Sequence, residues 1–267
     1  MIADQPDVLP ARHHVEFVMG MAVSIDIRDV DVPETAVDDV VAWLHHVDAT
    51  FSTYLEDTPI SALGRGEIDL EAAGDEIRTV LRQCEDLRIE SSGVFDVFEV
   101  PAPNGTRLDP SGFVKGWSIE HAATMLEQHG CLNFCINAGG DIAIRGNPAP
   151  GEPWRIGIRH PDRADALATV LVASHQLGIA TSATYERGAH IVDPRTGRPV
   201  TDIASASVVG PDLTLADAYA TILFVMGVDG LDWIAAHDGY DAYVITHDDT
   251  TRWTEGFQRY REASPKP

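Results

Sequence analysis

The chain has 267 residues, of which 42 are acidic and 19 basic, so its formal net charge is −23. Hydrophobic residues make up 44% of it and are spread along its length, which excludes a disordered chain and allows a substantial core. So acidic a surface repels nucleic acid and anionic lipid, and neither is expected as a partner. We count no apolar run of about 18 residues and expect no membrane insertion.

The start of the chain, MIADQPDVLPARHHVEF, lacks the basic residues and apolar run of a secretory signal. We therefore expect a cytoplasmic protein. Three cysteines, Cys84, Cys131 and Cys135, form no disulfide framework and stand among apolar residues, which predicts thiols buried in the core.

Apolar periodicity predicts the elements in chain order. Residues 15–28 alternate as strands around Gly20, and helices follow at about 35–50, 74–90 and 113–129; Thr35 would cap the first and Gly130 would end the third. The remaining predicted elements are strands at 132–137, 141–145, 154–159, 167–173, 189–192, 204–209 and 241–246, and helices at 215–226 and 229–237. Runs of helices and runs of strands indicate an α+β fold. We place a single domain at 15–250, between an N-terminal extension (1–14) and a C-terminal tail (251–267).

Two glycine-containing segments stand at the ends of predicted elements. In LDPSGFVKG, Lys115 and the free N–H groups of a helix start would attract an anion; the alternative is an ordinary loop-to-helix junction. In INAGGDI, paired glycines allow a ligand or a backbone to approach closely. The simpler interpretation there is a hairpin turn, with Gly140 at positive φ and Asp141 as its cap.

Two further segments gather polar side chains. ATSATYER places small hydroxyl residues before Tyr185, although a plain polar loop would have the same composition. HIVDPRTGRP brings a His, an Asp and an Arg within six residues, and a His exchanges protons near neutral pH. The alternative is a hairpin turn, because Asp-Pro and Thr-Gly pairs both favour turns.

The fifth segment, ADAYATILFVMG, places Asp217 and Thr221 four residues apart on a predicted helix, and so on one face of it. A carboxylate and a hydroxyl suit Mg²⁺, which prefers oxygen ligands. The alternative is a polar edge on a buried helix, with the Thr221 hydroxyl bonded to a carbonyl one turn earlier.

Taken in order, FVMGMAVSI, SSGVFDV, LDPSGFVKG, INAGGDI, ATSATYER, HIVDPRTGRP and ADAYATILFVMG resemble the FAD:protein FMN transferase family, also called the ApbE family. The resemblance extends from Phe17 to Thr246. It implies an α+β domain with mixed or antiparallel sheets, packed helices and a flavin cleft between two lobes. It also implies a Mg²⁺-dependent (or Mn²⁺-dependent) enzyme that moves FMN from FAD to a Thr or Ser hydroxyl of an acceptor protein and releases AMP. The acceptor would carry a motif of the form D-x-x-[ST]-G-A-[ST].

The resemblance assigns roles to individual residues. His190 would transfer the proton and Asp193 would orient the site. The metal ligands would be the Gly112 carbonyl and the side chains of Asp217 and Thr221. FAD would be contacted by Met19, Val94, Phe95, Asp96, Lys115, Tyr185 and Ile191.

Two segments depart from the family pattern. Asp109-Pro110-Ser111-Gly112 stands where Asp-Leu-Gly-Gly is usual, and Ser182-Ala183-Thr184-Tyr185 stands where Ser-Gly-Asp-Tyr is usual. The second change removes a carboxylate near the nucleotide. Two alternatives to the transferase therefore stay open: a Mg²⁺-dependent FAD hydrolase, and an FAD-binding protein without turnover.

Overall fold

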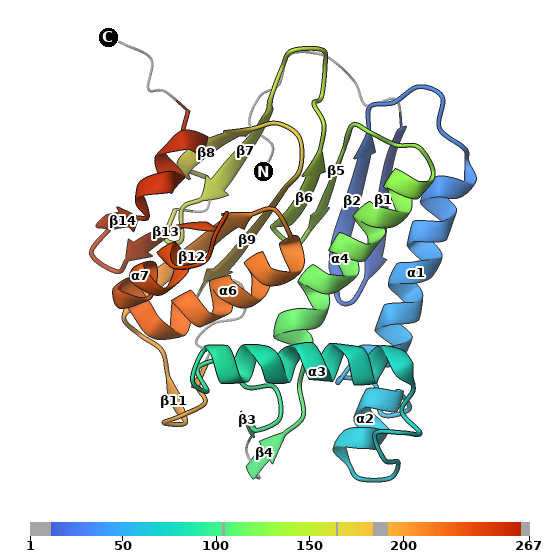
Figure 1. The fold of residues 1–267 in the computed structure, drawn as a ribbon, viewed down its shortest axis with the longest axis vertical. Coiled ribbons are helices and arrows are strands. Elements are labelled where there is room, and N and C mark those ends of the chain that lie inside the picture. Colours follow the sequence, from blue (N-terminus) through green and yellow to red (C-terminus); the bar gives the residue numbers. More distant parts are fainter. Residues whose placement is uncertain (1–11, 103–104, 164, 184–191, 263–267) are drawn as a thin grey trace.

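An eight-stranded antiparallel sheet forms the centre of the molecule (Figure 1). The computed structural model describes residues 12–102, 105–163, 165–183 and 192–262. In spatial order the strands are β1 (Arg12–Val18), β2 (Met21–Ile27), β5 (Phe134–Ala138), β6 (Asp141–Arg145), β9 (Leu177–Ala183), β12 (Ile203–Gly210), β13 (Asp241–Thr246) and β14 (Thr251–Trp253). The β1–β2 and β5–β6 pairs are tight hairpins, with Val18 paired to Met21 and Ala138 to Asp141.

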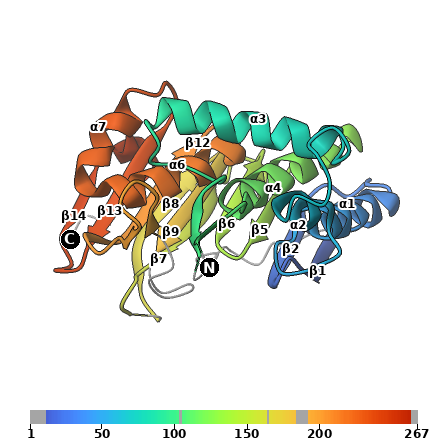
Figure 2. The same ribbon diagram turned by 90° about the horizontal axis from the view of Figure 1, so that it is seen from below.

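Helices cover one face of this sheet in two layers. The inner layer contains α1 (Thr35–Phe51), α4 (Ser111–Gln128) and α6 (Leu213–Met226), and α3 (Asp75–Glu90) lies across it on the outside (Figure 2). Every residue of β12 is buried, as are most residues of α6. Burial on all sides explains why these segments are apolar without the alternation of a surface element.

A two-stranded hairpin covers part of the opposite face. β7 (Trp154–Arg159) and β8 (Leu167–Ala173) pair with each other and pack on the sheet through a second apolar cluster that includes Trp154, Ile144 and Phe257. Figure 2 shows this hairpin on the side of the sheet away from α3. The shorter elements are α2 (Pro59–Gly64), β3 (Val100–Ala102), β4 (Gly105–Arg107), β10 (Val192–Asp193), β11 (Arg198–Pro199), η1 (Gly227–Asp229), α7 (Gly230–Ala235) and η2 (Glu255–Tyr260).

The α+β prediction and most of the predicted elements are confirmed, with ends that differ by a few residues. β9 was missed, because its sequence LGIATSA is rich in small residues and shows no clear alternation. The predicted cap is wrong: Thr35 is the first helical residue, and the N-cap is Glu34, whose side chain makes no capping hydrogen bond. Gly130 follows α4 with φ 85°, as predicted.

The first and last strands of the sheet extend beyond the expected domain boundaries at residues 15 and 250, which stay a prediction. β1 begins at Arg12, and β14 pairs with β13 through Tyr243 and Trp253. Phe257, which follows in η2, is fully buried. A fragment cut at residues 15 and 250 would therefore lose part of the first strand and all of the last.

One helical stretch, Leu213–Ala235, is long and apolar enough to cross a membrane by length and composition alone, with a mean hydropathy of 1.4 over its best window. This stretch was not expected from the sequence, where no apolar run of about 18 residues is present. More than half of this window, 56%, is buried inside the protein, and a helix in a protein core passes the same test. Its apolar character thus has an explanation in the packing of α6 against the sheet.

All three thiols are buried, as predicted. Burial raises the pKa of Cys84 and of Cys135 to about 12 and that of Cys131 to about 11, because a thiolate would lose its hydration there.

Candidate functional site

The helices α4 and α6 touch backbone to backbone at Gly116. A β-carbon on this residue would lie 2.6 Å from Asp217 Cβ and 2.7 Å from the Leu213 carbonyl oxygen, so only glycine fits. At the same point the Gly116 N–H donates a hydrogen bond of 2.9 Å to Asp217 Oδ2. The Lys-Gly segment and the Asp217 segment, predicted separately from sequence, therefore form one structure.

Lys115 lies between two buried carboxylates. Its Nζ is 2.6 Å from Asp141 Oδ2 and 3.8 Å from Asp217 Oδ1. Asp141 and Asp217 are 1% and 4% exposed, whereas the lysine side chain is 23% exposed. The other oxygen of Asp141 accepts the Thr181 N–H at 3.2 Å, which ties β6 to β9. Because buried charges need partners, two carboxylates facing one ammonium make this a place that favours additional positive charge.

Thr221 and Gly112 lie beside this cluster. The Thr221 hydroxyl is 3.5 Å from the Ser182 hydroxyl on β9, and a β-carbon on Gly112 would lie 3.9 Å from both Thr221 Oγ1 and a ring carbon of Phe95. In a regular helix the Gly112 carbonyl accepts a hydrogen bond from the Gly116 N–H. Here the Gly116 N–H also donates to Asp217, so the carboxylate and the Gly112 carbonyl compete for the same N–H group. The three expected metal ligands and Phe95 are thus brought together.

Three other residues expected to contact FAD have different surroundings. Met19 has φ 54° in the β1–β2 turn, and its sulfur is 3.9 Å from the hydroxyl of Ser118, which stands three residues after Lys115 on α4. Val94 is buried in the core. Asp96 Oδ1 accepts the N–H groups of the two residues Phe98 and Glu99, at 2.8 and 3.2 Å, and so holds a local turn.

The glycine pair of INAGGDI forms the predicted hairpin turn, with both Gly139 and Gly140 at positive φ. The predicted cap is wrong, however. The Gly140 N–H donates to Asn137 Oδ1 at 3.0 Å, while Asp141 turns inward to Lys115. Asp141 is therefore a site residue that the sequence interpretation missed, since an acid after two glycines is also typical of a turn.

The described part of the HIVDPRTGRP segment, from Val192 on, forms the hairpin β10–β11, as its turn signals predict. Asp193 accepts from both the backbone N–H and the guanidinium of Arg195, at 2.9 to 3.0 Å, and these hydrogen bonds lower the pKa of its carboxyl. Its expected role in orienting the site stays a prediction. Three residues with expected roles, His190, Ile191 and Tyr185, lie outside the described residues, as does Thr184 of the second departure.

A cavity of about 580 Å³ lies on another face of α4, between α3 and α6. None of the expected site residues lines it; its walls include Phe113, Trp117, Glu120 and Tyr219. In the described part of the chain, no group of three or more His, Cys, Asp and Glu side chains is arranged to hold a metal ion. A metal at the α4–α6 contact would therefore rest on mixed oxygen donors, not on a carboxylate cage.

Comparison with protein families decides the relationship. The family model described as "ApbE family" matches residues 100–244, more than half of the chain, and this range includes every expected metal ligand. The chain belongs to the ApbE family.

Two curated relatives illustrate the similarity. A protein of Escherichia coli K12 named FAD:protein FMN transferase is 31% identical over 148 residues, which are 52% of this chain and 42% of the relative. A Vibrio cholerae protein of the same name is 31% identical over 169 residues, 60% of this chain and 49% of the relative. The matched region thus spans about half the length of these ApbE relatives.

Solved ApbE structures share the fold. The flavin transferase ApbE from Vibrio cholerae superposes with a TM-score of 0.79 at 23% identity, covering 93% of this chain and 98% of that one. The ApbE protein from Thermotoga maritima gives a TM-score of 0.79 at 21% identity, covering 94% and 99%. The expected single ApbE-like α+β fold is confirmed.

Proposed function

We propose that this ApbE family chain transfers FMN from FAD to a Thr or Ser hydroxyl of an acceptor protein and releases AMP. The observation that carries the proposal is the meeting of Lys115, Asp217, Thr221 and Gly112 where α4 and α6 touch. The name shared by the curated relatives supports the choice of FAD and of a protein acceptor.

The residues present fit a divalent cation. Mg²⁺ in proteins is commonly held by one or two carboxylates, with substrate phosphates and water completing its shell. Asp217, Thr221 and the Gly112 carbonyl offer a carboxylate and two neutral oxygens, and the excess of buried negative charge beside Lys115 favours a cation. When bound, Mg²⁺ or Mn²⁺ would neutralise charge that develops on the pyrophosphate oxygens.

The reaction itself is a balanced substitution at phosphorus. The acceptor oxygen forms a bond to the FMN phosphorus, the bridging P–O bond of FAD breaks, and AMP leaves with the bridging oxygen. Lys115 supplies positive charge next to the anionic substrate, and the wall next to Gly112 is formed by Phe95. Because helices α4 and α6 are locked at Gly116, these groups keep their positions during the reaction.

An alcohol is a weak nucleophile and needs a base close by. We assign this role to His190, whose imidazole is the side chain best suited to take a proton near neutral pH. Asp193 is the alternative carboxylate, but its pKa is lowered by Arg195, which makes it a weaker base.

The test is an assay of purified protein with FAD, Mg²⁺ and an acceptor domain that carries the D-x-x-[ST]-G-A-[ST] motif. We expect flavin fluorescence on the acceptor band, a matching increase in its intact mass, and one AMP per label. A Thr→Ala acceptor is the control and should stay unlabelled. AMP without label, even with an acceptor from the same genome, would favour the hydrolase. Bound FAD with neither product would favour a flavin-binding protein without turnover, in which the Ala183 and Thr184 departures would be the first residues to revert.

A further inference from the structure

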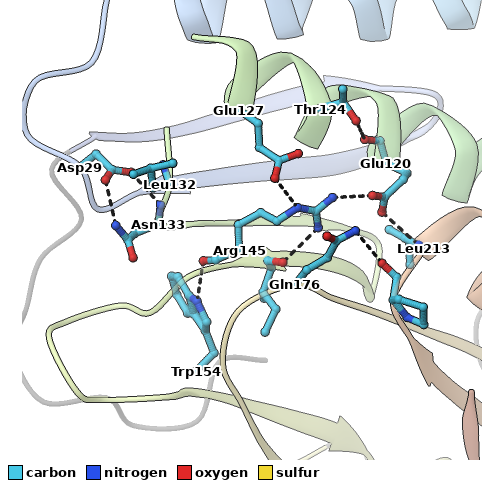
Figure 3. A network of polar contacts seen from close by, with 12 residues as sticks. Asp29, Glu120, Thr124, Glu127, Leu132, Asn133, Arg145, Trp154, Gln176 and Leu213 are labelled. Atoms are coloured by element: carbon cyan, nitrogen blue, oxygen red, sulfur yellow. Dashed lines mark hydrogen bonds and ion pairs between the residues drawn. The ribbon is translucent and has the colours of Figure 1, made fainter. Parts of the chain in front are cut away.

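A buried arginine links the three elements that carry the candidate site. Arg145 ends β6, four residues after Asp141, and its side chain is only 5% exposed. Its guanidinium pairs with Glu120 and with Glu127, both on α4, the second at 3.1 Å (Figure 3). The Arg145 carbonyl also accepts the indole N–H of buried Trp154 at 3.1 Å. This arginine therefore has a fixed place under α4.

Glu120 carries the link on to α6. While one carboxylate oxygen pairs with Arg145, the other accepts the N–H of Leu213 at 3.0 Å. Leu213 is the first residue of α6, where backbone N–H groups lack a partner inside the helix. The Asp212 side chain caps the Leu215 N–H of the same turn, at 3.1 Å. Glu120 is thus a polar contact that, beside the packing at Gly116, joins the start of α6 to α4.

The start of α6 sets the position of the metal-binding face. Asp217 comes four residues after Leu213 and Thr221 four residues after that, so both follow any shift or rotation of the first turn. The Leu213 carbonyl is also the atom against which Gly116 packs. A movement of Leu213 would therefore change the spacing between Asp217, Thr221 and the Gly112 carbonyl.

We propose that Glu120, held by Arg145, is a positioning residue that aligns α6 with α4 so that Asp217, Thr221 and Gly112 can share one cation. The proposal rests on the metal site of the proposed function, whereas its hydrogen-exchange readout depends only on the position of α6. The link runs from Arg145 on β6 through the Glu120 carboxylate on α4 to the Leu213 N–H, and Figure 3 shows these three residues side by side.

The sharpest test compares two double variants of the full chain, Arg145→Met/Glu120→Met and Arg145→Met/Glu120→Gln. Neither leaves a buried charge without its partner, and apolar replacement of a buried ion pair is often tolerated. They differ in one property: glutamine can still accept the Leu213 N–H, whereas methionine cannot. Glu127→Met is the matched control, because Glu127 also pairs with Arg145 but makes no contact with α6 in the described hydrogen bonds.

We expect the Met/Met variant to need roughly 10-fold more Mg²⁺ for half-maximal FAD binding and transfer than the Met/Gln variant, as for the loss of one well-placed contact. Hydrogen exchange at residues 211–218 should also be faster in the Met/Met variant. Glu127→Met should stay within about twofold of the wild type, because the Glu127 side chain is 43% exposed and Arg145 keeps its pair with Glu120.

Equal Mg²⁺ dependence and equal exchange in the two double variants would overturn the proposal. Unfolding of the Met/Met variant alone would also overturn it, in favour of a purely structural role. Failure of the proposed function would give a different result. The wild-type protein would then bind FAD without labelling the acceptor, and the variants could still be compared by Mg²⁺-dependent FAD binding and by hydrogen exchange.

Discussion

Gly116→Ala is the substitution for which the structure gives the clearest expectation. The new methyl would lie 2.6 Å from Asp217 Cβ and 2.7 Å from the Leu213 carbonyl oxygen. Carbon atoms pack at about 3.5–4.0 Å, so the two helices would have to separate by roughly 1 Å. Overpacking of this kind costs about 1–3 kcal/mol, and alanine returns about 1 kcal/mol through its higher helix propensity. The net loss of stability should therefore be about 0–2 kcal/mol.

The loss of activity should be much larger than the loss of stability. The separated helices carry Lys115 and the Gly112 carbonyl on one side and Asp217 on the other, and a misplacement of about 1 Å can reduce a rate by about 100-fold. The assay is AMP release with acceptor labelling, alongside urea unfolding of the same preparation.

Gly64→Ala provides the control for this experiment. Its β-carbon would lie 3.5 Å from Leu108 Cβ, an ordinary contact, and the residue ends the short helix α2 without touching α6 or either carboxylate. We expect this variant to match the wild type in both measurements. A Gly116→Ala protein with wild-type activity and stability would refute the reasoning, because it would mean that the α4–α6 contact is not as tight as the structure has it.

Four further substitutions or treatments have defined outcomes. Asp217→Ala should abolish metal-dependent transfer, and transfer by a metal-stripped wild-type enzyme would contradict this. Lys115→Met removes the ammonium group that Asp141 and Asp217 share. It should lower the free energy of unfolding, measured by urea titration without Mg²⁺, by about 3–5 kcal/mol. A stability equal to that of the wild type would show that these ion pairs are not important. Native protein should resist thiol reagents at pH 8 and react with three equivalents after unfolding. Burial raises the pKa of Cys84 from 9.0 to about 12, so above pH 9 the folded state keeps a proton that the unfolded state loses. The free energy of unfolding should therefore be constant with respect to this thiol below pH 9 and should fall as the pH rises above 9. Cys84→Ala should make that fall shallower.

Local signals in the sequence predicted the separate parts of the fold well. The periodicity of α1 and α3 reflects one buried stripe on each helix, and the glycine pair before Asp141 predicts a two-residue turn in any context. β9 was missed because its neighbours β6 and β12, not its own side chains, make it a strand. Sheet pairing across such distances in the chain leaves no mark on a strand of small residues.

The site was predictable as a set of segments but not as a geometry. The spacing of Asp217 and Thr221 indicated a shared helix face, which the structure confirms. Nothing in the sequence indicated that Asp141 would turn away from its own hairpin toward Lys115, or that Arg145 would lie buried at the end of an apolar strand. Both depend on which helix packs over β6, and packing between distant segments is settled only in three dimensions.

The charges of the site also bear on how FAD would bind. The chain carries a net charge of −23, and its field opposes an anionic dinucleotide. Lys115 alone cannot reverse this, because two buried carboxylates face its ammonium group. A divalent cation would change the sum of these charges from −1 to +1. We therefore expect FAD binding itself, and not only turnover, to require Mg²⁺. Quenching of flavin fluorescence with and without chelator measures this directly. Equal FAD affinity in the two conditions would mean that the pyrophosphate lies away from Asp217 and that the assignment of the metal face is wrong.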